Sequence, residues 1–362
     1  MTIIRKRLPE PVFHEVFRFV LKLLDTQGLL RGKTLGIDAT TLEANAAMKS
    51  IVRKDTGEDW KEYLRQLAKA EGIENPTDDG LRRIDRGRPD KKVSNQEWQS
   101  PTDPDSRIAR MKDGRTHLAY KLEHAVDLQT EAIVHAHVAK ADRSDPETGT
   151  ESLMLAQATL VACGSEVSVD ELVADKGYHD NTLLARCQDW QVRTYIPERK
   201  QKVRRWKNKP SGFEAAFRGN RRRVRAEKGK RLNRWRSERC ERTFAHVCET
   251  GGGRRSWLSG LKNVTKAYVL KCAAYNLGLL LRKVWGLSKP RNWEESAAAY
   301  FWLCWSWILL GALVMASGTD RAGDALRPGV RLLVISALAV GGAGFWQLRL
   351  HGRKNRRFLT AC

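Results

Sequence analysis

Residues 170–178 read D-E-L-V-A-D-K-G-Y. The apolar run at 172–174 predicts a short buried strand, and Asp175 follows directly at its carboxyl end. Gly177 then gives the backbone the freedom to turn. Because α/β proteins usually carry out their chemistry at the carboxyl ends of sheet strands, Asp175 is a candidate active-site residue.

Asp38 is a second candidate carboxylate, because it also follows an apolar run that predicts a strand, at residues 35–37. Thr40 and Thr41 come shortly after it and are placed to orient its side chain by hydrogen bonds. An alternative is that Asp38 is only the polar end of a strand, with the threonines in a turn. The residues alone leave both interpretations open.

Glu241 is the third candidate and lies within the helix-like run at 239–249. Helical spacing places Cys240 and Phe244 on an apolar stripe, with Glu241 beside it. A carboxylate at the edge of a buried helix face needs a partner, which is either an arginine or a divalent cation. Glu238, one turn earlier, is a weaker candidate for the same role.

The remaining pattern predicts an α/β fold with a mixed sheet. An amphipathic helix at 11–30 precedes the first strand, and a polar, charged excursion follows that strand at 49–102. The later elements are a hairpin (117–127 and 131–140), a helix (144–161), a strand (172–174), a helix (181–190), a strand (192–196) and a helix (265–283). Alternation of this kind is typical of an α/β sheet with some antiparallel members.

The charge of the chain indicates a polyanionic partner. Its 362 residues include 65 lysines and arginines against 42 aspartates and glutamates, for a formal net charge of +23. Much of the excess lies in a basic segment at 199–236, whose self-repulsion favours binding to phosphates. A solvated charged helix is the alternative. The candidate DNA-contacting residues are Arg204, Arg205, Trp206, Arg221, Arg222, Arg223 and Arg234.

Seven dispersed cysteines without a C-x-x-C pair indicate a reducing compartment such as the cytoplasm and argue against a zinc ribbon. The N-terminus lacks the apolar core of a secretion signal. The tail at 287–362 differs from the rest, because residues 300–316 and 332–346 carry no charge. A membrane hairpin is one interpretation of this tail, and packing or oligomerisation is the other; membrane association is not favoured.

Two aspartates from adjacent strands and a glutamate from a helix would form an all-oxygen site. Such hard ligands suit Mg²⁺ or Mn²⁺. Two such ions about 3.5–4 Å apart activate an attacking oxygen and stabilise the leaving oxygen in an in-line displacement at phosphorus. We therefore expect hydrolysis of a DNA strand, followed by attack of the freed 3′-hydroxyl on a second strand.

Three motifs resemble DDE transposases of bacterial insertion sequences. They read G-I-D-A-T-T-L-E-A-N-A-A at 36–47, A-D-K-G-Y at 174–178 and E-R-T-F-A-H at 241–246. The resemblance implies an RNase-H-like mixed sheet flanked by helices, in a catalytic domain at 33–286. The helical segment at 1–32 would then be a shortened DNA-binding region, followed after the catalytic domain by a hydrophobic helical tail.

The same resemblance implies roles for the candidate residues. Asp38, Asp175 and Glu241 would be the catalytic triad that binds Mg²⁺ or Mn²⁺. The substrate would be double-stranded DNA, namely the terminal inverted repeats of the element and its target DNA. We expect the protein to act on that DNA as a homo-oligomer.

Two departures from the family pattern keep alternatives open. Family members usually carry a longer DNA-binding region before the first aspartate. They also carry a basic residue one to two turns after the glutamate, where this chain has F-A-H-V-C-E-T at 244–250. The alternatives are an inactive or truncated transposase-derived DNA-binding protein and a nuclease of the same fold.

Overall fold

The computed structural model describes residues 7–111, 113–199, 205–284 and 286. The helices are α2 (Glu10–Thr26), α3 (Trp60–Ala70), α4 (Asp78–Gly87), α5 (Ser94–Glu97), α6 (Asp145–Ala162), α7 (Asn181–Asp189), α8 (Phe213–Arg225), α9 (Glu227–Phe244) and α10 (Leu261–Val284). The strands are β1 (Thr34–Glu43), β2 (Val52–Arg53), β3 (Trp98–Gln99), β4 (Arg107–Arg110), β5 (Thr116–Asp127), β6 (Ile133–Lys140), β7 (Glu171–Ala174) and β8 (Arg193–Tyr195). The chain divides into two compact units, Met1–Leu280 and Leu281–Cys362, and the architecture that follows is that of the first.

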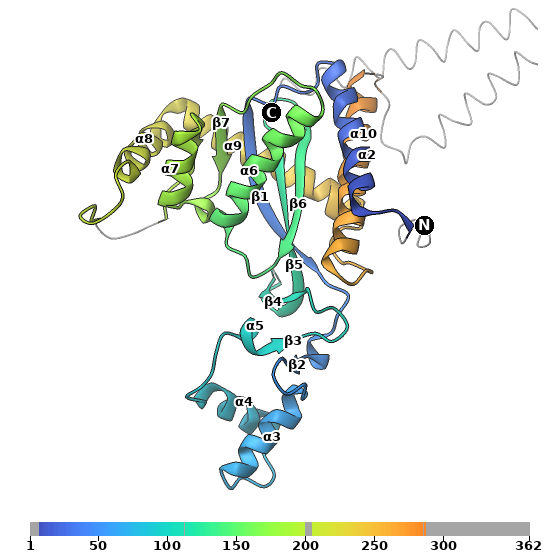
Figure 1. Cartoon of the computed structure of the whole chain (residues 1–362), viewed down its shortest axis with the longest axis vertical. Coiled ribbons are helices and arrows are strands. Elements are labelled where there is room, and N and C mark those ends of the chain that lie inside the picture. The colour runs from blue at the N-terminus through green and yellow to red at the C-terminus, as the bar shows by residue number, and fades with distance from the viewer. Residues whose placement is uncertain (1–6, 112, 200–204, 285, 287–362) are drawn as a thin grey trace, which may run out of the picture. The chain divides into compact units, whose positions relative to one another are not determined.

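A six-stranded mixed sheet forms the centre of this unit. Its strand order is β4-β5-β1-β7-β8, and β6 also pairs with β5 (Figure 1). β1 runs antiparallel to β5 and parallel to β7, which is parallel to β8. Helices flank the sheet: α6 packs on β5 and β6, whereas α9 packs on β1 and β7. The predicted α/β fold with some antiparallel strands is therefore confirmed.

Helix α2 contributes to the same hydrophobic core as the sheet. Its buried side chains Phe17, Leu21 and Leu24 belong to one cluster with the apolar residues of the strands. The helix ends before Gly28, whose φ of 66° is the left-handed conformation that glycine adopts readily. The amphipathic helix predicted at the start of the chain is confirmed, and its apolar face is covered by this core.

Strand β1 is longer than its apolar run indicates. The prediction that the strand ends just before Asp38 is wrong, because the antiparallel pairing with β5 continues from Leu35 to Glu43. The long strand β5 supplies hydrogen-bonding partners along the whole of β1. Asp38 is consequently a residue in the middle of a central strand, paired with His124 of β5 and one residue beyond the last pair of β1 with β7.

Gly36 allows α9 to lie close against β1. A Cβ atom at this position would lie 2.5 Å from the Leu128 side chain and 3.1 Å from Sγ of Cys240. Both of those side chains are fully buried, so neither has room to move away. The glycine thus permits the helix that carries Glu241 to cross the strand that carries Asp38.

The charged excursion forms its own small cluster of elements. Its helix α3 has Asp59 as N-cap, which accepts hydrogen bonds from two backbone N–H groups of the first turn. A second apolar cluster joins α3 to α4 through Leu64, Ala68 and Leu81. The excursion therefore has a small apolar cluster of its own, and it is also joined to the main core through Ile51 and Trp98.

The hydrophobic tail predicted at 287–362 and the candidate residue Arg204 lie outside the described residues. Within the part of the chain that the structure describes, no helix is both long and apolar enough to cross a membrane.

Gly149 offers a test of the packing between α6 and the turn after β7. Alanine in a helix interior is usually favoured over glycine by about 1 kcal/mol. Here the added Cβ would lie 2.5 Å from the buried Tyr178 ring, whose hydroxyl is bound to Glu123. We expect Gly149→Ala to lower the free energy of unfolding by about 1–2 kcal/mol, measured by urea denaturation.

The matched control is Gly80→Ala, in α4, where the nearest atom to the new Cβ lies 3.5 Å away. That variant should be as stable as the wild type or more stable by up to about 1 kcal/mol. Equal effects of the two substitutions would contradict the packing argument.

Candidate active site

Asp38 and Asp175 lie on neighbouring strands at the same level of the sheet. β1 and β7 run in parallel, and Ile37 is paired with Ala174. Asp38 directly follows Ile37, and Asp175 directly follows Ala174. Adjacent strands are about 4.8 Å apart. The predicted placement of two aspartates on adjacent strands is confirmed.

The turn after β7 holds Asp175 by backbone geometry. Asp175 is the N-cap of the short helix η2 (Lys176–Tyr178), and its Oδ1 accepts a hydrogen bond of 2.7 Å from Gly177 N. A Cβ on Gly177 would collide with the carboxylates of Asp145 and Asp175. Only glycine fits between these two acidic side chains, which explains why residue 177 is a glycine.

Glu241 lies on α9, beside the buried residue Cys240, and its own side chain is exposed. Its Oε1 accepts a hydrogen bond from Ser237 Oγ at 3.3 Å. Glu238 is instead paired with Arg242. The arginine partner considered for Glu241 is thus found at the weaker candidate, and Glu241 has a hydroxyl neighbour.

A buried histidine fastens α9 to β5 directly opposite Asp38. His124 is the cross-strand partner of Asp38, and its Nδ1 lies 3.0 Å from the Thr243 hydroxyl. Its Nε2 lies 2.6 Å from the Tyr268 hydroxyl of α10. Its ring stacks on Phe244, with centroids 4.1 Å apart. Burial lowers the pKa of His124 to about 3, so the imidazole stays neutral at physiological pH.

The three acidic groups interact electrostatically. The pKa of Asp38 is raised to about 6: burial raises it most, Arg236 and the hydrogen bond from Ala39 N lower it, and the negative charges of Asp175 and Glu241 raise it. Arg236 Nη1 donates to Asp38 Oδ2 at 2.9 Å, and Ala39 N donates to Oδ1 at 2.9 Å. Asp38 is therefore close enough to both Asp175 and Glu241 for their charges to act on it.

They are not gathered into a coordination cluster. Among the described residues, no group of three histidine, cysteine, aspartate or glutamate side chains is close enough to hold a metal ion. One oxygen of Asp38 is held by Arg236. The structure thus brings the two aspartates and the helix of the glutamate together, with an arginine as the partner of the most buried carboxylate.

The donor chemistry nevertheless fits a hard divalent cation. All three side chains offer carboxylate oxygens, the ligands that Mg²⁺ and Mn²⁺ prefer. Asp175 and Glu241 each raise the pKa of Asp38, so both repel the charge of its carboxylate, whereas Arg236 lowers that pKa. A bound cation would offset that repulsion.

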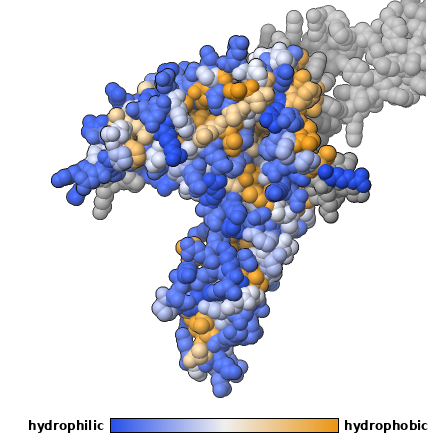
Figure 2. Space-filling model, viewed as in Figure 1, coloured by the Kyte–Doolittle hydropathy of each residue, from blue (hydrophilic) through white to orange (hydrophobic). Residues whose placement is uncertain are grey.

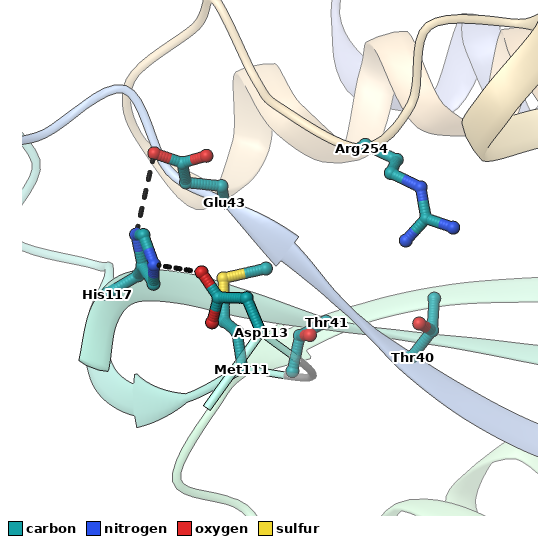
Figure 3. A pocket seen from close by; sticks show the side chains of 7 residues that line it. All are labelled: Thr40, Thr41, Glu43, Met111, Asp113, His117 and Arg254. Carbon is teal, nitrogen blue, oxygen red and sulfur yellow. Dashed lines mark hydrogen bonds and ion pairs between the residues drawn. The ribbon is translucent and has the colours of Figure 1, made fainter. Parts of the chain in front are cut away.

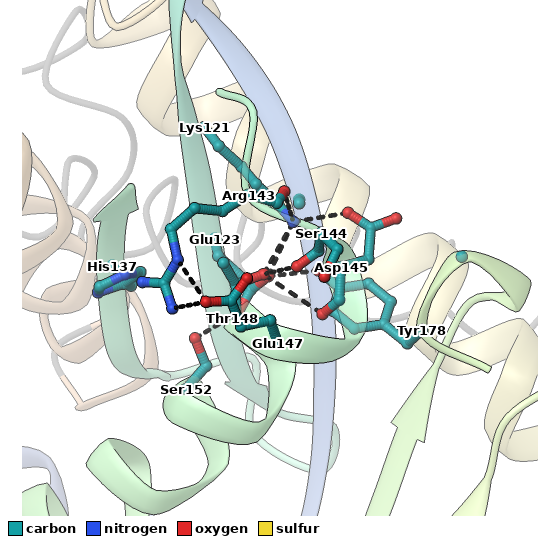
Figure 4. Close-up of polar contacts among 12 residues, drawn as sticks. Lys121, Glu123, His137, Arg143, Ser144, Asp145, Glu147, Thr148, Ser152 and Tyr178 are labelled. Atoms are coloured by element: carbon teal, nitrogen blue, oxygen red, sulfur yellow. Dashed lines mark hydrogen bonds and ion pairs between the residues drawn. The ribbon is translucent and has the colours of Figure 1, made fainter. Parts of the chain in front are cut away.

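A polar network behind the Asp175 turn escaped the sequence analysis (Figure 4). Tyr178 donates a hydrogen bond of 2.7 Å to the buried Glu123, which also accepts hydrogen bonds from Thr148 and Ser152. Lys121 Nζ lies 2.6 Å from Asp145 Oδ1. Burial raises the pKa of Glu123, and these hydrogen bonds oppose the rise. The network anchors the residue that ends η2, and with it the turn that carries Asp175.

The candidate DNA-contacting arginines differ in their bonding within the protein and in their exposure. Arg221 makes a two-point ion pair with Glu198 at 2.6 and 2.8 Å, and Arg223 donates to Thr194 O at 2.9 Å. Arg205, Arg222 and Arg234 are exposed, and so is Arg221 despite its ion pair. The surface over α7 and α8 is largely hydrophilic (Figure 2).

The two tryptophans of the basic segment are partly buried. The Trp206 ring packs against Phe217, with centroids 5.1 Å apart. Arg239 lies 4.3 Å from the centroid of the Trp235 ring, which packs on the core. Both rings have protein partners, so the prediction that they stack on bases gains no support from their surroundings.

A family model, described as "Transposase DDE domain", matches residues 84–277, more than half of the chain. The chain belongs to the transposase DDE domain family. The matched range of this transposase contains Asp175 and Glu241, whereas Asp38 precedes it. Neither the search of curated proteins nor that of solved structures found a match.

The buried His124 predicts a pH dependence of stability. Between pH 7 and pH 5 the unfolded imidazole takes up a proton near pH 6.5, whereas the folded one stays neutral down to about pH 3. Stability is therefore lost as the pH falls. We expect the wild-type transposase to lose about 2 kcal/mol more than His124→Phe over this interval, measured by urea denaturation.

The nearby groups Thr243, Tyr268, Cys272 and Phe244 are the same in both proteins, and so is the contribution of the buried His135. Parallel stability curves for the two proteins would show that His124 is protonated in the folded state.

Proposed function

We propose that this protein is a transposase that cuts and joins DNA at the ends of its own mobile element, with Asp38, Asp175 and Glu241 as its catalytic carboxylates. The observation that supports this most is the level placement of Asp38 and Asp175 on parallel strands. The crossing of α9 over β1 places the helix of Glu241 next to them.

The sheet order supports an RNase-H-like catalytic domain. Three antiparallel strands, β6, β5 and β1, are followed by two parallel strands, β7 and β8. The first aspartate lies on the central strand and the second at the carboxyl end of its parallel neighbour. This is the arrangement that the resemblance to bacterial insertion-sequence transposases leads one to expect.

Asp38, Asp175 and Glu241 would hold Mg²⁺ or Mn²⁺. When bound, such ions lower the pKa of an attacking water and stabilise the leaving oxygen at phosphorus. The chain itself contributes two rigid ligand positions on the sheet and one on a helix. Arg236 shares or releases its Asp38 oxygen when a cation binds there, because that oxygen is already a hydrogen-bond acceptor.

The exposed arginines of α8 and α9 supply the contact with double-stranded DNA in this proposal. Arg222, Arg225, Arg231 and Arg234 are exposed. Together with the net charge of +23 they would bind phosphates without regard to sequence. The DNA would be the terminal inverted repeats of the element and its target DNA, and the protein would act on it as a homo-oligomer.

A second candidate is a DNA-binding descendant of a transposase that no longer cuts. The ion pair between Arg236 and Asp38, and the lack of a metal-binding group among the described residues, favour this alternative. Both candidates share the basic surface, so DNA binding alone does not separate them.

Substitution of single carboxylates separates the two candidates. We expect Asp175→Asn and Glu241→Gln to reduce Mg²⁺-dependent cleavage of the DNA that flanks the coding region by roughly a thousandfold or more. Affinity for the same DNA should change by less than about threefold, because the phosphate-binding surface is untouched. The assays are strand cleavage and strand transfer on labelled duplexes.

The matched control is Glu238→Gln, one turn before Glu241 and paired with Arg242, which should leave cleavage unchanged. A wild type that binds these ends but never cuts them would favour the non-cutting descendant. Cleavage without joining would indicate a nuclease of the same fold.

A further inference from the structure

The segment Arg254–Trp257 is fastened to the end of the strand that carries Asp38. Glu43 N donates to Arg254 O at 3.0 Å, and Ser256 N donates to Glu43 O at 2.8 Å. Asn45 Nδ2 donates to Trp257 O at 3.4 Å. The backbone of this segment therefore has a fixed place beside β1, five residues beyond the candidate catalytic aspartate.

The side chains of Arg254, Arg255 and Trp257 are exposed, whereas that of Ser256 is buried and donates to Leu258 O. Trp257 is 76% exposed, whereas Trp98 is buried and Trp206 and Trp235 are partly buried. Arg255 lies over its ring, with Cζ 5.6 Å from the centroid. A large exposed ring on a hydrogen-bonded backbone offers apolar area for a binding partner to cover.

A small pocket of about 140 Å³, lined by both polar and apolar atoms, lies beside the same strand end (Figure 3). Its lining residues are Thr40, Thr41, Glu43, Met111, Asp113, His117 and Arg254. Arg254 is exposed and is paired only at the surface, with Glu249. Surface pairs of this kind contribute about 0–1 kcal/mol, so the guanidinium exchanges partners readily.

We propose that Arg254–Trp257 is a nucleotide-binding segment in which Trp257 stacks on an unpaired base of the DNA and Arg254 and Arg255 bind the adjoining phosphates. This inference rests on the proposed function, because it places the base near the strand break made at Asp38. A base presents its face to a side chain only when it is unpaired, as at a freshly opened DNA end. An aromatic ring flanked by arginines is the combination that binds single-stranded DNA without sequence preference.

The test compares two duplexes of the same sequence, one blunt and one with a short 3′ single-stranded overhang. Affinities of the full-length protein are measured by fluorescence anisotropy in EDTA, so that no cleavage occurs. The wild type should bind the overhang duplex more tightly. Trp257→Ala should weaken binding to that duplex by about five- to one-hundredfold while changing the blunt duplex by less than twofold.

Two control variants make the test specific. Trp257→Phe keeps a ring and should retain most of the preference for the overhang. Trp190→Ala removes another exposed tryptophan, 42% exposed at the end of α7, and should bind both duplexes as the wild type does. Because Trp257 is largely exposed, its loss should leave folding intact.

Three outcomes would overturn the inference. One is an unchanged preference for the overhang in Trp257→Ala, and another is an equal loss of affinity for both duplexes. The third is a change of oligomeric state in Trp257→Ala, seen by sedimentation, with DNA binding unaltered, which would assign the ring to a second copy of the chain. Mg²⁺-dependent cleavage by the wild type is measured separately, so the proposed function and this inference are tested by different experiments.

Discussion

The seating of α9 on β1 at Gly36 is the contact on which the candidate site depends. The side chain of Cys240 occupies the space that a Cβ at Gly36 would need. Because Glu241 follows Cys240 and Asp38 lies two residues beyond Gly36, this close approach brings the helix of the third carboxylate to the strand of the first. The parallel register of β1 with β7 places Asp175 in the same way.

Two carboxylates on opposite faces of the sheet show what distinguishes a structural acid from a candidate functional one. Glu123 is buried but accepts hydrogen bonds from three hydroxyl groups, those of Thr148, Ser152 and Tyr178. Asp38 has one arginine and one backbone N–H, and two further acids raise its pKa. Hydrogen bonds within the protein therefore stabilise Glu123, whereas the charges of two neighbouring acids still disfavour the ionised form of Asp38.

Periodicity in the sequence was sufficient to predict the hairpin, the strand before Asp175 and the helix that carries Glu241, because each depends on local spacing. The end of β1 could not be predicted, since its length is set by its partner β5. Glu123 was missed because a charged residue that alternates with apolar ones resembles the solvent face of a strand, and only α6 covers it. Arg223 looked like a DNA contact because the residue that binds it, Thr194 on β8, is distant in sequence.

The third carboxylate and the exposed tryptophan lie on one continuous stretch of chain. α9 passes directly into the π-helical turn η3 (Ala245–Thr250), which leads through three glycines to Arg254. This stretch is fastened to β1 at both ends, at Gly36 through Cys240 and at Glu43 through Arg254 and Ser256. DNA that engages Trp257 would therefore contact the same piece of chain that positions Glu241, on either side of Asp38.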